Sequence, residues 1–192
     1  MVAEPSEWIA RTSSRREFLL AVDRIEEGPA LFIAEGGTGS GRGMLVDEAA
    51  RLLEGSGRDV RIAHLLGTDR LHSGHLAEQL ELSDRPLEGP AALLVKEAQS
   101  ADATSIGLLG RLLASGAPTV VILGLAPPPA DIAIILDRLA ETTGRYGVVH
   151  RIRLEPLTQA ELEEIADPET AGELLAATAG DPVALAGLLA TW

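Results

Sequence analysis

Short apolar runs alternate along the chain with longer segments of helical periodicity, and this alternation constrains the fold more than any other feature. Five runs are expected to form strands, at residues 30–34, 60–65, 91–95, 119–123 and 148–154. Helices are expected at 13–26, 42–53, 71–82, 103–114 and 131–141, with a turn at 85–90. Apolar strands separated by amphipathic helices are typical of a parallel sheet with helices on both faces. We therefore predict a five-stranded α/β core in which 148–154, with its alternating polarity, is an edge strand.

After the last expected strand, the sequence contains only helical patterns. Thr158 and Glu161 have the spacing of a capping box at a helix start. Two more helices are expected at 168–178 and 182–189, each beginning with a proline. We divide the chain into an α/β core at 1–156 and the start of a small helical segment at 157–192, both within one globular unit.

Composition narrows the class of protein. The 192 residues are 46% hydrophobic, which suits one compact domain, and they include no cysteine, which excludes disulfides and thiolate metal sites. No apolar run approaches the roughly 20 residues of a membrane helix, and the N-terminus lacks the apolar core of a signal peptide. We expect a cytoplasmic protein that does not contact a membrane.

The charge argues against direct binding to nucleic acid. The net charge is −13, and no Lys or Arg follows Arg153. The adjacent Arg15 and Arg16 are expected to be a solvated surface pair rather than part of a basic patch. A chain this acidic repels a phosphate backbone unless its basic residues gather on one face.

A glycine-rich segment follows the first expected strand and precedes a helix. It reads Glu-Gly-Gly-Thr-Gly-Ser-Gly-Arg-Gly over residues 35–43 and contains the G-x-x-x-x-G frame of a phosphate-binding P-loop between Gly36 and Gly41. Free backbone N–H groups and the helix dipole make such a turn an anion site. The candidate phosphate-binding residues here are Gly36, Gly37, Thr38, Gly39, Ser40, Gly41, Arg42 and Gly43.

Two side chains depart from the P-loop pattern. Arg42 stands where a lysine reaches the phosphates, and its planar fork is not equivalent to an ammonium. Gly43 stands where a Ser or Thr hydroxyl holds Mg²⁺, so it offers the metal no oxygen. The alternative interpretation of this segment is a glycine turn that binds nothing.

Four further segments point to a known family. Residues 93–102, Leu-Leu-Val-Lys-Glu-Ala-Gln-Ser-Ala-Asp, resemble the Walker B region of the STAND, AAA-related ATPases of large LuxR-type and AfsR-like bacterial regulators. The segment 15–18 is similar to that family's opening Gly-Arg-x-x-Glu-Leu, and 154–161 is similar to its Leu-x-Pro-Leu-Thr-x-x-Glu. Gly180-Asp181-Pro182 resembles the Gly-x-Pro of its helical lid. The resemblance covers nearly the whole chain.

This resemblance implies a P-loop NTPase sheet with strand order 5-1-4-3-2 and ATP or ADP in the loop, with Pro182 beside the nucleotide. It also implies a nucleotide-controlled switch coupled to downstream domains. Lys96, the single lysine of the chain, replaces the Walker B aspartate that holds Mg²⁺. Glu97 survives as the vestigial candidate for the catalytic carboxylate. The fourth strand ends at residues 123–126, Leu-Gly-Leu-Ala, without the Arg or polar residue that usually contacts the γ-phosphate, so we expect hydrolysis to be lost.

Two hypotheses concern the lysine. In the first, Lys96 takes the place of Mg²⁺ and, with Arg42, holds ATP, ADP or phosphate without metal. In the second, Lys96 pairs with Glu97 or a neighbouring carboxylate and fills a vacated site. We expect no metal site: His72, His75 and Glu78 could share a helix face, but such trios often occur by chance.

Three functions remain open at this level. The first is a catalytically degenerate P-loop domain that serves as a regulatory or protein-interaction module of a bacterial signalling or transcription regulator, with protein partners or downstream domains. The second is a nucleotide-binding switch with little or no hydrolysis. The third is an active NTPase that uses Glu97 with rearranged metal ligands.

Overall fold

A five-stranded parallel sheet organises the protein. The computed structural model describes residues 13–25, 28–67, 74–82, 87 and 89–190. The strands are β1 (Ala30–Gly36), β2 (Asp59–His64), β3 (Ala91–Lys96), β4 (Thr119–Leu125) and β5 (Val148–Leu154). Their order is β2-β3-β4-β1-β5, and every neighbouring pair is parallel. The predicted fold class and strand order are confirmed, with β5 at an edge.

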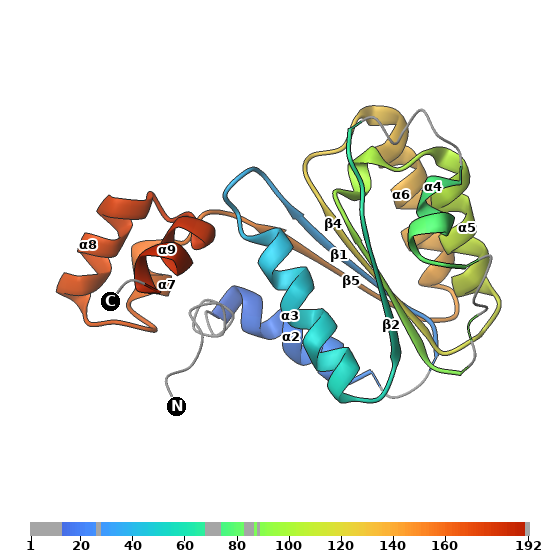
Figure 1. The fold of residues 1–192 in the computed structure, drawn as a ribbon, viewed down its shortest axis with the longest axis horizontal. Coiled ribbons are helices and arrows are strands. Elements are labelled where there is room, and N and C mark those ends of the chain that lie inside the picture. The colour runs from blue at the N-terminus through green and yellow to red at the C-terminus, as the bar shows by residue number, and fades with distance from the viewer. Residues whose placement is uncertain (1–12, 26–27, 68–73, 83–86, 88, 191–192) are drawn as a thin grey trace.

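Helices cover both faces of the sheet (Figure 1). The helices of the core are α2 (Ser13–Asp23), α3 (Arg42–Gly55), α4 (His75–Gln79), α5 (Ala103–Ala114) and α6 (Ala130–Thr143), with a short 3₁₀ turn, η2 (Ala98–Ser100). α2 and α3 lie on one face, whereas α4, α5 and α6 lie on the other. The buried apolar residues form one cluster on each face, which explains why the strands carry nearly continuous apolar runs.

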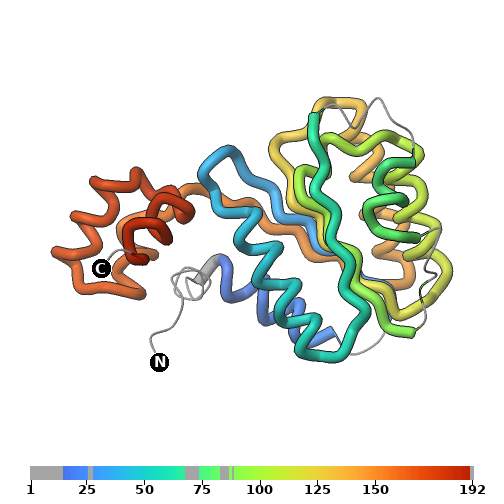
Figure 2. Tube along the Cα trace, viewed as in Figure 1, coloured from blue at the N-terminus to red at the C-terminus, as the bar shows by residue number. Residues whose placement is uncertain are grey.

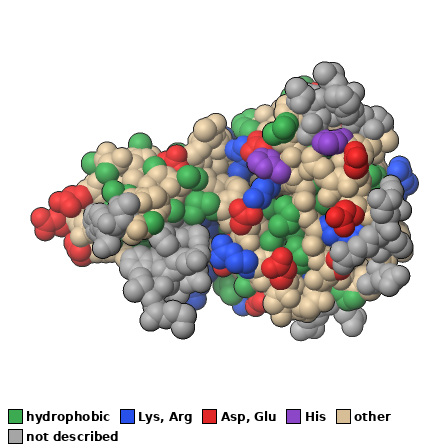
Figure 3. All heavy atoms as spheres, viewed as in Figure 1, with side chains coloured by type: hydrophobic (Ala, Val, Ile, Leu, Met, Phe, Trp, Pro, Cys, Tyr) green, Lys and Arg blue, Asp and Glu red, His purple; other side chains and the backbone are tan. Residues whose placement is uncertain are grey.

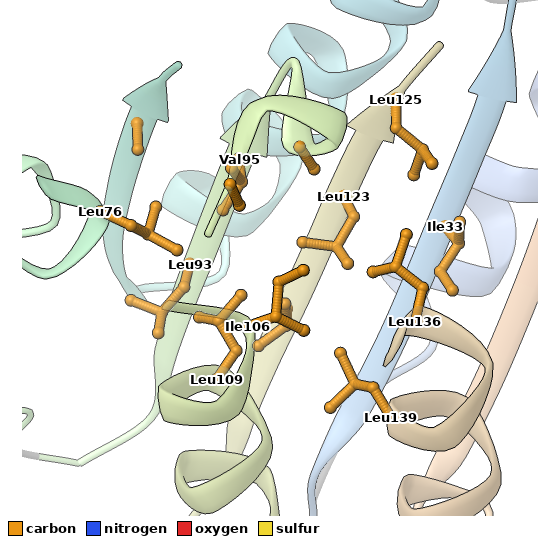
Figure 4. Packing of buried hydrophobic residues seen from close by; sticks show 14 of the residues in the cluster. Ile33, Leu76, Leu93, Val95, Ile106, Leu109, Leu123, Leu125, Leu136 and Leu139 are labelled. Carbon is orange, nitrogen blue, oxygen red and sulfur yellow. The ribbon is translucent and has the colours of Figure 1, made fainter. Parts of the chain in front are cut away.

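The larger cluster joins the sheet to α5 and α6. Figure 4 shows Leu93, Leu123 and Ile33 of three neighbouring strands facing Leu109 of α5 and Leu136 of α6. On the opposite face, Phe18 of α2 packs edge-on against Phe32 of β1, with ring centroids 5.4 Å apart. Both clusters are closed to solvent, so the sheet is a rigid base for the loops at its carboxyl edge.

Three short helices form a separate lobe after β5, here called the lid (Figure 2). They are α7 (Gln159–Leu162), α8 (Pro168–Thr178) and α9 (Pro182–Leu189). The predicted capping box is present, since Thr158 accepts from the backbone of Glu161 while the Glu161 side chain accepts from that of Thr158. The lid has its own apolar cluster, against which Met44 of α3 packs.

Gly180 connects the lid helices in a tight turn. Its φ is +75°, and its carbonyl accepts a 2.7 Å hydrogen bond from the backbone N–H of Leu157. A Cβ on Gly180 would lie 2.2 Å from the Leu157 carbonyl oxygen. Only glycine therefore allows the α8–α9 turn to sit against the segment that leaves β5.

Most expected boundaries agree with the structure within two residues, but two helices are shorter than predicted. The first ends at Asp23 instead of residue 26, which lies outside the described residues. α4 ends at Gln79 rather than at residue 82, because Glu81 adopts a φ of +53° and Arg61 donates to the carbonyls of Leu80 and Glu81. Residues 71–73 and part of the expected turn at 85–90 lie outside the described residues.

No single helix within the described ranges is both long and apolar enough to cross a membrane, although α8 and α9 together, as a bent pair, meet the criterion by length and composition.

A substitution at Gly180 tests how the lid is attached. We expect Gly180→Ala to lower the free energy of unfolding by about 1–3 kcal/mol, because the positive φ and the Leu157 carbonyl both oppose a Cβ. Urea unfolding measures the change. Gly172→Ala in α8 is the matched control: a Cβ there meets nothing within 4 Å, so alanine should be neutral or stabilise by up to ~1 kcal/mol. Equal effects of the two substitutions would contradict this account of the turn.

Candidate functional site

The strand register brings the predicted site residues to one edge of the sheet. Lys96, the last residue of β3, lies beside His64 of β2 on one side and Gly124 of β4 on the other. The glycine loop leaves β1 at the same carboxyl edge and leads into α3. In open parallel sheets this edge is the usual place for a ligand.

The loop has the backbone shape that its glycines predict. Gly39 and Gly41 have φ values of +76° and +75°, and Gly41 caps α3 without a side-chain bond. Ser40 donates its N–H to the Gly37 carbonyl at 3.3 Å, and its hydroxyl is buried without a partner among the described residues. Thr38 and Gly37 are exposed at the tip. The turn is therefore a wide glycine loop that ends at a helix N-terminus.

Arg42 points back into this loop instead of outward. Its Nη1 donates to the carbonyls of Gly36 at 2.6 Å and Gly37 at 3.0 Å. Its Nη2 donates to both carboxylate oxygens of Glu97, at 2.6 and 2.7 Å. The guanidinium thus joins the glycine loop to the end of β3 through four hydrogen bonds, two to backbone carbonyls and two to a carboxylate.

Glu97 is itself the centre of a chain of contacts. Gln99 donates to Glu97 Oε2 at 2.6 Å and accepts from the backbone N–H of Ala126, just beyond β4, at 3.0 Å. Burial raises the pKa of Glu97, but the hydrogen bonds from Gln99 and Arg42 outweigh it, so its pKa lies below the ordinary value. Glu97 also has a φ of +56°, a conformation that a non-glycine residue keeps only when its surroundings impose it.

Lys96 and Glu97 do not pair with each other. The Nζ of Lys96 lies 2.5 Å from Oδ1 of Asp47, one turn into α3 from Gly43. The carboxylate that Lys96 contacts is therefore the neighbouring Asp47. Two oppositely oriented ion pairs, Arg42–Glu97 and Asp47–Lys96, connect the start of α3 to the end of β3.

A small open hollow lies between these pairs. Arg42, Gly43, Val46, His64, Lys96, Glu97 and Gly124 line it, and its volume is about 170 Å³. Figure 3 shows basic, acidic and histidine side chains gathered between the N-terminal end of α3 and the end of β2. Pockets that enclose a ligand of drug size begin at ~300 Å³. The hollow is smaller than this range.

The turn between α8 and α9 of the lid packs against the glycine loop. The contact is so close that a Cβ on Gly41 would lie 2.8 Å from Pro182, and one on Gly39 would lie 3.0 Å from Oδ2 of Asp181. Pro182, predicted to lie beside a nucleotide, therefore packs directly on the loop. Asp181 had not been identified from the sequence as a site residue, although it lies within the Gly-x-Pro motif.

Arg15 is buried, which corrects the expectation of a solvated pair with Arg16. The residue is only 2% exposed, and its side chain donates to the carbonyls of Ser40 at 2.9 Å and Glu155 at 3.3 Å. Its Nη1 lies 3.7 Å from Glu161 of the lid. Burial lowers the pKa of Arg15, and the charge of Glu161 opposes that shift. Arg15 thus links α2, the loop and the lid, whereas Arg16 is exposed.

The sequence analysis missed three of the partners. Asp47 lies in none of the motifs, whereas Gln99 and Asp181 lie within the segments 93–102 and 180–182 at positions to which no role was assigned. Asp47 lies five residues after Arg42 on the same helix, and Gln99 lies in the segment that follows Glu97. Across the described ranges, no group of three or more His, Asp or Glu is placed to hold a metal ion. His75 lies 3.5 Å from Glu78, and His72 lies outside the described residues.

Comparisons with known proteins support the fold alone. No protein-family model and no curated protein matches the sequence. The structure is similar to that of the Aeropyrum pernix ORC2 protein in ADPNP-ADP complexes, with a TM-score of 0.52 and 16% identity over 84% of this chain and 52% of that one. It is also similar to Drosophila ORC bound to DNA, with a TM-score of 0.52 and 18% identity over 84% of this chain and 48% of that one. The chain has an AAA+ ATPase-like fold and spans about half the length of these proteins.

The lowered pKa of Glu97 predicts a pH dependence of stability. Ionised Glu97 stabilises the folded protein above the ordinary glutamate pKa of about 4.3, and this contribution is lost as the pH falls through the lowered pKa. Glu97→Gln should therefore cost about 1 kcal/mol at pH 7, a modest value because solvent reaches the pair, and should flatten the pH profile. Urea unfolding between pH 3 and pH 7 is the measurement.

The control is Glu54→Gln, which removes an exposed carboxylate from the far end of α3. We expect its profile to follow that of the wild type. A Glu97→Gln profile with the full pH dependence of the wild type would contradict the proposed role of the Arg42 and Gln99 hydrogen bonds.

Proposed function

We propose that this domain is a catalytically degenerate AAA+-like P-loop domain that does not hydrolyse ATP and works as a regulatory or protein-interaction module. The observation that carries the proposal is the position of Arg42, whose guanidinium is held by the carbonyls of Gly36 and Gly37 and by both oxygens of Glu97. The residue that would contact phosphates and the residue that would activate water neutralise each other.

The residues at the expected Mg²⁺ position also support the absence of hydrolysis. Phosphoryl transfer by P-loop enzymes depends on a bound Mg²⁺ and on polar groups around the γ-phosphate. Gly43 has no oxygen for the metal, and an ammonium, Lys96, lies where a metal-binding carboxylate would be needed. The residues at the end of β4 are Gly124, Leu125 and Ala126, and none of them has a side chain that can donate a hydrogen bond to a phosphate. Restoring turnover would require several changes at once.

A regulatory role follows from the resemblance to large bacterial regulators and from the loss of chemistry. On this proposal, the domain passes a conformational or binding signal to protein partners or to further domains, in the cytoplasm. Contact with nucleic acid would then belong to other parts of an assembly, because this chain carries a net charge of −13.

A second candidate is a nucleotide-binding switch. The loop keeps the backbone of an anion site, with positive φ at Gly39 and Gly41 and a helix N-terminus behind it. The solved structure of the ORC2 protein contains ADPNP and ADP. For such a ligand to bind here, Arg42 would have to leave Glu97, and Lys96 would have to serve in place of Mg²⁺ after leaving Asp47.

Phosphate release from ATP tests the absence of hydrolysis. We expect wild-type protein at saturating ATP and Mg²⁺ to release phosphate no faster than the Glu97→Gln variant, because Glu97 is held by Arg42 and Gln99. Release by the wild type well above that variant would overturn the proposal and favour an active NTPase that uses Glu97.

A repaired site provides the complementary test. The triple substitution Arg42→Lys, Gly43→Thr and Lys96→Asp restores the phosphate-contacting and metal-holding groups on an unchanged backbone. We expect ATP with Mg²⁺ to raise the melting temperature of this variant by several degrees and to leave that of the wild type unchanged; binding at about 100 times Kd stabilises a fold by ~2.7 kcal/mol. An equal shift in both proteins would support the nucleotide switch instead.

A further inference from the structure

We propose that Asp181 is a specificity-determining residue that excludes polyphosphates from the glycine loop. This inference rests on the proposed function, since it gives a reason why the loop stays without a nucleotide even though its backbone keeps the shape of an anion site. It assigns to the middle residue of the Gly180-Asp181-Pro182 turn a role that is separate from the contacts of Arg42.

The first step is the position of the carboxylate. Oδ2 of Asp181 lies so close to Gly39 that a Cβ on this glycine would be 3.0 Å from it. Gly39 is at the centre of the loop, between Gly36 and Gly41. Any phosphate held by the N–H groups of this loop would therefore lie within a few ångströms of a negative charge, at a distance where protein charges interact strongly.

The second step is that this side chain is fixed. Asp181 is the N-cap of α9, and its Oδ1 accepts from the N–H groups of Val183 at 2.8 Å and Ala184 at 3.3 Å. The cap holds Oδ1, so Oδ2 stays directed at the loop. The turn at residues 180–182 is held by the hydrogen bond from Leu157 to Gly180 and by the packing of Pro182 on Gly41.

The third step is that the charge is not compensated locally. Residues 157–192 contain seven acidic residues and no Lys or Arg. Within the part of the chain that the structure describes, Asp181 forms no ion pair with a basic side chain. The cations around the loop already have partners: Arg42 binds Glu97, Lys96 binds Asp47, and Arg15 donates to the Ser40 carbonyl and lies 3.7 Å from Glu161. A polyphosphate that entered the loop would therefore meet a carboxylate that pairs with no basic side chain among the described residues.

Substitution of Asp181 by asparagine can separate the effect of its negative charge on the loop from its role as the N-cap of α9. Asn is as good an N-cap as Asp, so Asp181→Asn keeps the start of α9 and removes only the charge. Asp167 provides a matched control, because it caps α8 in the same way, through hydrogen bonds to Glu169 and Thr170. Asp167→Asn therefore removes the same unit charge from the same lid through the N-cap of a different helix.

The experiment is a calorimetric titration of the whole chain with tripolyphosphate and, separately, with ATP. Both titrations are done in EDTA, to exclude a metal, and at low ionic strength, where exposed charges are least screened. We expect Asp181→Asn to bind tripolyphosphate at least about tenfold more tightly than the wild type and Asp167→Asn, because a like charge beside a bound polyanion weakens binding. The melting temperature without ligand should be nearly equal in the three proteins.

Two results would overturn this inference. The first is no gain in affinity for Asp181→Asn. The second is an equal gain for Asp167→Asn, which would assign the effect to the overall charge of the lid. A gain for ATP but not for tripolyphosphate would also contradict it, since the effect would then come from the base or ribose. These outcomes are independent of the proposed function, which fails only if the wild type hydrolyses ATP or binds it with Mg²⁺.

Discussion

The ion pair between Arg42 and Glu97 is the interaction on which the rest of the site depends. It joins the first residue of α3 to the residue after β3, and through the carbonyls of Gly36 and Gly37 it also holds the loop that leaves β1. Gln99 extends the connection to the backbone after β4. In an active P-loop enzyme, a nucleotide and its metal bridge these same elements. Here the side chains of the protein form the bridge, and Glu97 itself has a positive φ, a conformation that a non-glycine residue keeps only when its surroundings impose it.

The lid completes the closure with different chemistry. Pro182 packs on Gly41, and the Asp181 carboxylate lies against Gly39. The buried Arg15 contacts both the loop, at the Ser40 carbonyl, and the lid, at Glu161. The two sets of contacts involve different parts of the loop: Arg42 pairs with Glu97 at the start of α3, whereas Asp181 and Pro182 lie against Gly39 and Gly41. Neither requires a change in the fold, so both are compatible with an AAA+-like architecture. The lid is positioned by the Gly180 turn together with Pro182 and Arg15, whereas the sheet is stabilised by two apolar clusters.

The sequence was sufficient to predict the fold and the location of the site, because both depend on local patterns. Apolar runs of strand length specify the sheet, and the frame from Gly36 to Gly41 specifies the loop between β1 and α3. One of the two hypotheses for Lys96 was a pairing with Glu97 or a neighbouring carboxylate, but the sequence could not identify Asp47 as the partner, since this contact depends on how α3 is rotated against the end of β3. Arg15 was misjudged because its burial comes from contacts with Ser40 and Glu155, the latter 140 residues away in the sequence. Helix α4 was predicted to be too long, because the sequence does not show that Arg61 of β2 donates to the carbonyls of Leu80 and Glu81 at its end.

A double-mutant cycle on Arg42 and Glu97 tests the central claim most directly. The free energy of unfolding is measured at pH 7 for the wild type, Arg42→Gln, Glu97→Gln and the double variant. If the pair closes the site as described, the two single substitutions are not additive, and the coupling energy is about 1 kcal/mol in favour of the pair. Additive effects, within about 0.3–0.5 kcal/mol, would contradict the account, because each side chain would then act independently of the other.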